Sequence, residues 1–117
     1  MKHITELFEI NGKAIGVVIV NFGKSLFVWV GSESVKFDSL FVSFPYKNDK
    51  YSDDFVTTSL LDENELGYSI SSHICKSQNI AISLSMNIED ELDNIEMREL
   101  QVFLNEKISE ISVKSIR

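Results

Sequence analysis

The sequence predicts an α+β fold in which a six-stranded, mainly antiparallel sheet packs with two amphipathic helices, in the order βββββαβα. Three observations carry this prediction. Five short segments of β-type composition follow one another in the first half, one alternating strand comes later, and two segments repeat apolar residues at helical spacing. Because most strands precede the helices, the pattern favours α+β over an alternating α/β arrangement. The 117 residues suit one domain over residues 1–117.

Two tight turns delimit the first strands. Asn11-Gly12 is the strongest short hairpin signal, because both residue types tolerate positive φ, and Gly23-Lys24 makes a second turn. The first four strands are predicted at residues 4–10, 13–22, 25–31 and 37–44. They are expected to form an antiparallel meander.

A polar segment separates the fourth strand from the fifth. Residues 45–54 hold the single proline and are predicted to form an exposed loop, and β-type composition resumes at residues 55–61. A sixth strand follows much later, where apolar residues alternate with small ones over residues 80–86. This strand is expected to join the meander as the sixth strand of the sheet.

Helical periodicity appears twice. The first helix is expected to be capped by Asp62 or Asn64 and to end near Gln78, and the second is expected to be capped by Asp93 or Asn94. We expect the helices to pack through apolar residues at three- and four-residue spacing, namely Leu66, Ile70 and Ile74 in the first and Leu100, Leu104 and Ile108 in the second.

Both faces of the predicted sheet are apolar. Leu26 and Val28 point to one side of their strand, whereas Phe27 and Trp29 point to the other. Two helices can cover one face, so the second face is covered either by the sheet folding into a sandwich or by another subunit. The aromatic residues Phe27, Trp29 and Phe41 are therefore candidates for a protein interface, with core packing as the alternative explanation.

The acidic surplus is local. The net charge is -7, and most of the 18 acidic side chains fall within residues 49–65 and 89–99. These acids either solvate connecting segments or steer a basic partner protein. A negative net charge repels phosphate backbones and anionic lipids, so nucleic acid and membrane surfaces are not expected as partners.

No catalytic, cofactor or metal site is predicted. His73 and Cys75 stand two residues apart on a helix, so their side chains point about 200° apart and cannot form a nucleophile and base pair. The acids at residues 89–99 lack the glycine of a calcium loop, and the five glycines form no phosphate-binding motif. We expect a protein that is not an enzyme, with Cys75 packed as a small apolar residue.

The expected location is the cytoplasm, with the nucleus as an alternative. The single cysteine cannot form an internal disulfide, and charged residues interrupt the apolar ones over residues 1–10, unlike a secretory signal. The longest apolar stretch, residues 14–20, is too short to span a bilayer.

Two motifs resemble the proteasome assembly chaperone 4 family. Residues 25–31 read SLFVWVG, similar to that family's DSLFLWVG strand, and residues 56–61 read VTTSLL, similar to its VSTSLL. The elements that follow occur in the family's order, so the resemblance spans residues 3–111. This sequence departs from the family in Lys24, where an acid is frequent, and in its own loop at residues 45–54.

The resemblance implies a non-enzymatic chaperone that pairs with a related protein, proteasome assembly chaperone 3, and binds α-type subunits while the 20S α-ring is built. A permanent partner chaperone would then use the apolar surface of Phe27, Trp29 and Phe41. A client subunit that must be released would rely on charge, and the candidates for that contact are Asp53, Asp54, Asp62 and Glu63.

Two alternatives stay open from the sequence. The chain forms either a homodimer when it is isolated or a heterodimer with the related chaperone. The rival function, from a different class, is a small scaffold of the longin or profilin-like kind in a trafficking or signalling complex.

Overall fold

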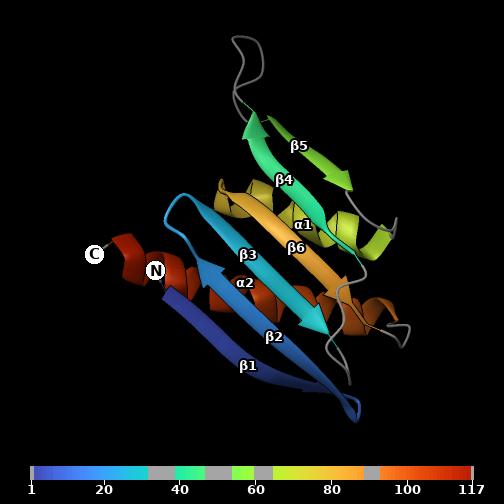
Figure 1. Cartoon of the computed structure of the whole chain (residues 1–117). Helices are drawn as coiled ribbons and strands as arrows, with labels where there is room; N and C mark the ends of the chain where they lie inside the picture. Colours follow the sequence, from blue (N-terminus) through green and yellow to red (C-terminus); the bar gives the residue numbers. More distant parts are fainter. Residues whose placement is uncertain (1, 32–38, 47–53, 60–64, 89–92, 117) are drawn as a thin grey trace.

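The computed structural model describes residues 2–31, 39–46, 54–59, 65–88 and 93–116 (Figure 1). Within these ranges the chain forms six strands and two helices, which confirms the α+β class and the order βββββαβα. The strands are β1 (Lys2–Ile10), β2 (Lys13–Asn21), β3 (Ser25–Gly31), β4 (Phe41–Tyr46), β5 (Asp54–Ser59) and β6 (Ala81–Asn87). The helices are α1 (Glu65–Gln78) and α2 (Asn94–Ile116).

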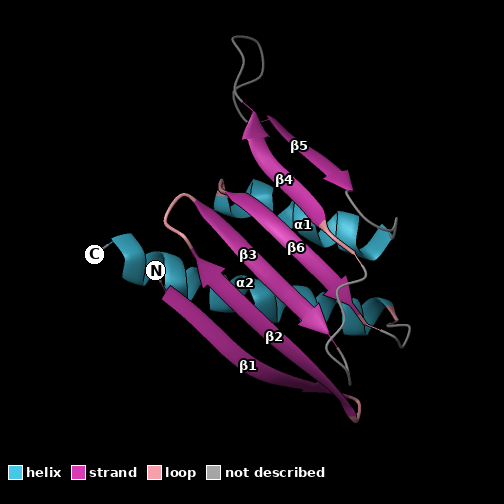
Figure 2. Ribbon diagram, viewed as in Figure 1, coloured by secondary structure: helices cyan, strands magenta, loops and turns pink. Residues whose placement is uncertain are grey.

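The described strands form one sheet in the order β1-β2-β3-β6-β4-β5 (Figure 2). All neighbouring strands are antiparallel except β3 and β6, which run parallel. The expected uninterrupted meander is therefore wrong, because β6 lies between β3 and β4 and makes the sheet mixed. Parallel neighbours need a long crossover connection, and the chain between β3 and β6, which includes β4, β5 and α1, supplies it.

The β1–β2 hairpin closes at the predicted turn. Asn11 and Gly12 have φ values of 48° and 78°, and Ile10 pairs directly with Lys13. Positive φ at both central residues matches the twist of a two-residue hairpin loop.

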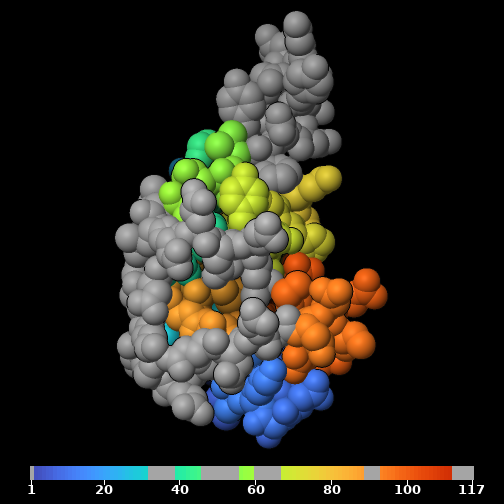
Figure 3. All heavy atoms as spheres, turned by 90° about the vertical axis from the view of Figure 1, so that its right-hand side faces the viewer, coloured from blue at the N-terminus to red at the C-terminus, as the bar shows by residue number. Residues whose placement is uncertain are grey.

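The start of α2 is fastened to this turn. Asp93 caps the helix, since its Oδ1 accepts a hydrogen bond from the Glu96 N–H at 2.8 Å, while Glu96 Oε1 accepts one from the Asp93 N–H at 3.0 Å. Asn11 Nδ2 donates to Glu96 Oε2 at 3.1 Å, and Lys13 Nζ lies 3.4 Å from Glu96 Oε1. The space-filling view shows the β1–β2 turn, in blue, against the first turns of α2, in orange (Figure 3). One carboxylate thus joins two distant parts of the chain.

Acid is expected to weaken the fold through Glu96. The hydrogen bond from the Asp93 N–H, followed by those from Asn11 and Lys13, lowers the pKa of the Glu96 carboxyl. Because the folded-state pKa lies below the unfolded value, the stabilisation is complete above about pH 4.3, where an unfolded glutamate titrates. It is lost as the pH falls through the folded-state pKa.

We therefore expect Glu96→Gln, which can keep the capping geometry without the charge, to lower the free energy of unfolding at pH 7. The difference from the original chain should begin to shrink below about pH 4.3 and disappear once the pH is below the lowered pKa of Glu96, where both side chains are neutral. Urea denaturation over this pH range measures the effect. A difference that stays constant with pH would show that the charge of Glu96 contributes nothing.

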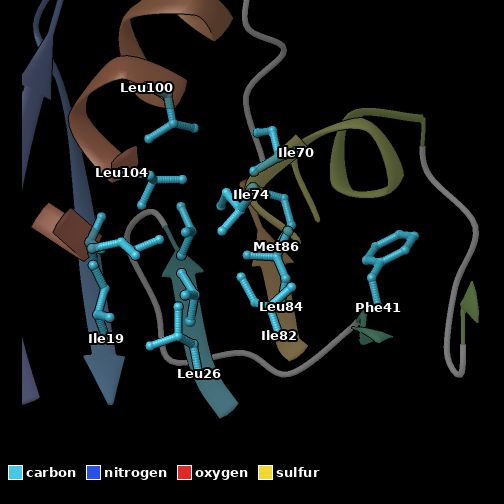
Figure 4. Packing of buried hydrophobic residues seen from close by; sticks show 14 of the residues in the cluster. Ile19, Leu26, Phe41, Ile70, Ile74, Ile82, Leu84, Met86, Leu100 and Leu104 are labelled. Carbon is cyan, nitrogen blue, oxygen red and sulfur yellow. The ribbon is translucent and has the colours of Figure 1, made fainter. Parts of the chain in front are cut away.

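The core lies between the sheet and the helices, which cover the same face (Figure 1). α1 packs against β4, β5 and β6, and α2 packs against β1 and β2. Side chains from β2, β3 and β6 meet the helices there (Figure 4), namely Ile15, Val17, Ile19, Leu26, Val28, Val30, Ile82, Leu84 and Met86. The described strands form one sheet and add no second layer, so of the two alternatives for the second face, a sandwich within the chain is not found in this part.

The helices pack largely as their periodicity predicts. Five of the six expected contact residues are almost completely buried, namely Ile70, Ile74, Leu100, Leu104 and Ile108. The side chain of Leu66 lies outside the described part. Over the residues that the structure describes, neither helix is long and apolar enough to cross a membrane.

Candidate interaction surface

The side of the sheet opposite α1 and α2 is called here the helix-free face. Along β2 and β3, fully buried residues toward the helices alternate with half-buried residues toward this face. Trp29 pairs with Val18 and Phe27 pairs with Val20 across these two strands. The centre of the helix-free face is therefore apolar and only partly shielded from water.

Exposed apolar side chains lie at two opposite margins of the helix-free face. Leu7 of β1 pairs with Gly16 and is 72% exposed. At the other end of the strand order, Phe44 and Val56 pair across β4 and β5 and are 41% and 40% exposed. Apolar side chains thus occur on this face from β1 to β5, with Ser83 and Ser85 of β6 between the aromatic residues of β3 and the apolar residues of β4 and β5.

The structure brings together two of the three predicted interface aromatics. Phe27 and Trp29 are half-buried on the helix-free face and belong to its centre. The Trp29 ring reaches the neighbouring backbone, since its six-membered ring lies over Gly31 and beside Gly16. Their role in pairing stays a prediction.

The third aromatic, Phe41, does not lie on the helix-free face, and core packing, the alternative explanation, is what the structure shows for it. It is 1% exposed and lies under α1 (Figure 4), because it pairs with Leu84, whose side chain points to the helices. Two residues further along β4, Ser43 Oγ is hydrogen-bonded to Ser71 Oγ of α1 at 2.7 Å, which places this side of β4 against the helix. Gly67 of α1 leaves room for the Phe41 ring, since a Cβ there would lie 2.8 Å from Cδ2.

The predicted client surface falls largely outside the described residues. Asp53, Asp62 and Glu63 lie outside them, and Asp54 begins β5 with a side chain that is also outside the described part. The acidic contact therefore stays a prediction.

Sequence reasoning missed the margin residues and the two glycines of the helix-free face. Leu7 belongs to a strand whose alternation is loose, so its side could have been inferred only from the pairing with Gly16. Phe44 and Val56 could have been found as a cross-strand pair once the register of β4 and β5 was known.

The reactive side chains of α1 do not form a site. Cys75 is buried, and burial raises the pKa of its thiol, whereas His73 is exposed. This agrees with the expectation that they point to different sides of the helix. In the described ranges, no group of three or more His, Cys, Asp or Glu side chains is placed to hold a metal ion.

Comparison with known proteins agrees with the resemblance noted in the sequence. A family model described as proteasome assembly chaperone 4 matches residues 14–88, which is more than half of the chain. No curated protein sequence matches the chain. Among solved structures, a chain from the crystal structure of a novel chaperone complex for yeast 20S proteasome assembly has a TM-score of 0.64 at 12% identity.

That similarity covers 99% of this chain and 98% of the yeast-complex chain, and at such low identity it shows the fold. The family match extends from the second residue of β2 to the residue after β6, and so includes the helix-free face from β2 to β5 and all of α1. The chain therefore belongs to the proteasome assembly chaperone 4 family, and its role is that of a proteasome assembly chaperone.

Proposed function

We propose that this chain acts without catalysis, as one member of a chaperone pair that holds α-type subunits while the 20S α-ring is built. The partner is a related chaperone of the proteasome assembly chaperone 3 kind. The family assignment supports the chaperone role, and the similar chain from a yeast chaperone complex supports a partner of this type. We propose a cytoplasmic location, with the nucleus as the alternative, because a lone cysteine suits a reducing compartment.

The proposed pairing rests on one observation, the apolar residues of the helix-free face. Its centre contains Phe27 and Trp29, and exposed apolar residues continue to both outer strands. Large apolar side chains gathered on one side of a sheet are seldom left in water, and permanent interfaces resemble a core cut in half. A second sheet stacked on this face would bury it as the two sheets of a sandwich bury each other.

Co-expression with the chaperone 3 protein and the α-type subunits of the same organism tests this proposal. We expect a stable one-to-one chaperone pair, and recovery of α-type subunits when one member of the pair carries the affinity tag. Recovery of trafficking or cytoskeletal proteins instead would favour the longin or profilin-like scaffold and overturn the proposal.

We propose that the client subunit is held through the acids around β5. Asp53→Lys together with Asp54→Lys should weaken binding of an α-type subunit and flatten its salt dependence, because peripheral charges control encounter and are screened by salt. Chaperone pairing and the melting temperature should hardly change. Binding measured at two ionic strengths tests this expectation.

The matched control reverses two exposed acids of α2, Glu99→Lys with Glu106→Lys, and changes the net charge equally. It should leave the salt dependence of client binding nearly intact. If the β5 reversals abolish chaperone pairing, or if client affinity is indifferent to salt, the acids do not have this role.

A further inference from the structure

We propose that Gly31 is a positioning residue of the pairing surface. Because it has no Cβ, it allows the Trp29 indole to lie flat along the helix-free face, so that a second sheet can approach closely. This inference rests on the proposed function of that face.

The indole occupies the space above Gly31. Trp29 and Gly31 are two residues apart in β3, so they face the same side of the sheet. A Cβ on Gly31 would collide with Cη2 and Cζ2 of Trp29 and would lie 3.1 Å from Cζ3. The contacts involve the outer edge of the ring, so the ring extends along its own strand.

Backbone conformation does not explain the glycine. The described glycines with positive φ are Gly12 and Gly23, so Gly31 has a backbone that other residues can adopt. Glycine within a strand weakens it and often marks a place of close approach. The indole is the group that approaches Gly31.

The shape of the surface indicates what docks there. Six strands, spaced about 4.8 Å apart, give a face about 24 Å across between the outer strands. A single helix is about 10 Å in diameter and would cover roughly two strands. The apolar residues at both margins, Leu7 and the Phe44–Val56 pair, therefore fit the apolar sheet of a second chain better than one helix.

The position of the indole matters for such a partner. Stacked sheets lie about 10 Å apart, so an indole standing upright from the face would hold the partner sheet away. A flat ring instead offers its face for stacking against aromatic or branched side chains of the partner.

Alanine substitutions at the two paired glycines separate this effect from a general effect on the sheet. Gly31→Ala introduces the collision, whereas a Cβ on Gly16 would lie 3.6 Å from Trp29 Cζ3, an ordinary contact. Gly16 and Gly31 are direct partners across β2 and β3, so Gly16→Ala is a matched control.

The fluorescence of the isolated chain reports the first half of the proposal, because the sequence holds a single tryptophan. In Gly31→Ala we expect a red-shifted emission and stronger quenching by acrylamide, as the indole is displaced toward water. Gly16→Ala should match the original chain. An unchanged spectrum in Gly31→Ala would overturn the positioning role.

Pairing with the chaperone 3 protein reports the second half. Gly31→Ala should weaken pairing about tenfold or more, and Gly16→Ala by less than about twofold. On a Trp29→Leu background, Gly31→Ala should cost no further affinity, because the colliding ring is absent. A displaced indole with undiminished pairing would overturn the docking role of Gly31.

Thermal melting guards against a variant that fails to fold. If Gly31→Ala is unfolded, the double variant Trp29→Leu with Gly31→Ala should still have the same melting temperature as Trp29→Leu alone. An equal loss of melting temperature from Gly31→Ala on both backgrounds would overturn the proposal. If the original chain does not pair with the chaperone 3 protein, the proposed function and the docking role both fail. The fluorescence result still decides whether Gly31 positions Trp29.

Discussion

Replacing Phe41 by alanine is expected to destabilise the fold by about 3–5 kcal/mol, the largest effect on stability among the changes proposed for this protein. The ring is 1% exposed and fills the space between β4 and α1 beside Gly67. Glycine has no side chain to move into the resulting cavity, so the cost includes the cavity as well as the lost apolar burial. Urea denaturation of the isolated chain measures the change.

Phe44→Ala is the matched control for this substitution. Phe44 belongs to the same strand but lies on the helix-free face with 41% exposure, so its loss should cost about 1 kcal/mol or less. If Phe41→Ala keeps the original stability and instead loses chaperone pairing, then Phe41 belongs to the interface after all.

Trp29→Ala is expected to weaken chaperone pairing by about 2 kcal/mol, roughly thirtyfold, as for an aromatic residue at the centre of an interface. Trp29 lies near the middle of the helix-free face, with Val18 on β2 and Ser85 on β6 as its cross-strand neighbours. Titration of the partner chaperone by calorimetry measures the loss. Binding of the α-type subunit should keep its salt dependence, because the substitution changes no charge.

Val102→Ala provides the control on the helical side. Val102 is exposed on α2, which covers the other face of the sheet, so this truncation should leave pairing unchanged. Equal losses in the two variants, or a loss in Trp29→Ala that follows unfolding, would show that the helix-free face is not the pairing surface.

The sequence predicts the elements of this fold well because each has a local cause. Asn11-Gly12 forms its turn through local backbone preference, and the four-residue spacing of Ile70 and Ile74 places them both in the core. Which strands lie beside β6 is not determined by its local sequence. Alternation over residues 80–86 shows that one side is buried, but it does not say which strands lie beside it.

The error at Phe41 has the same origin. Residues 25–30 and 39–44 read SLFVWV and SLFVSF, so Phe27 and Phe41 look equivalent. The side that each ring faces is set by register with other strands, and the pairing of Phe41 with Leu84 turns it toward the helices. Gly67 within a helix was the available signal, because a glycine there often marks close packing.

The central place of β6 also has a consequence for synthesis on the ribosome. β6 is the last strand along the chain, yet it separates β3 from β4. Until residues 81–87 emerge, the nascent chain can form the β1–β2–β3 unit and the β4–β5 hairpin, each with an open edge where β6 will insert. Open edges of this kind recruit strands from other chains, and pairing between distant segments is slow. We therefore expect this chain to be most prone to aggregate during its own translation, before β6 is available.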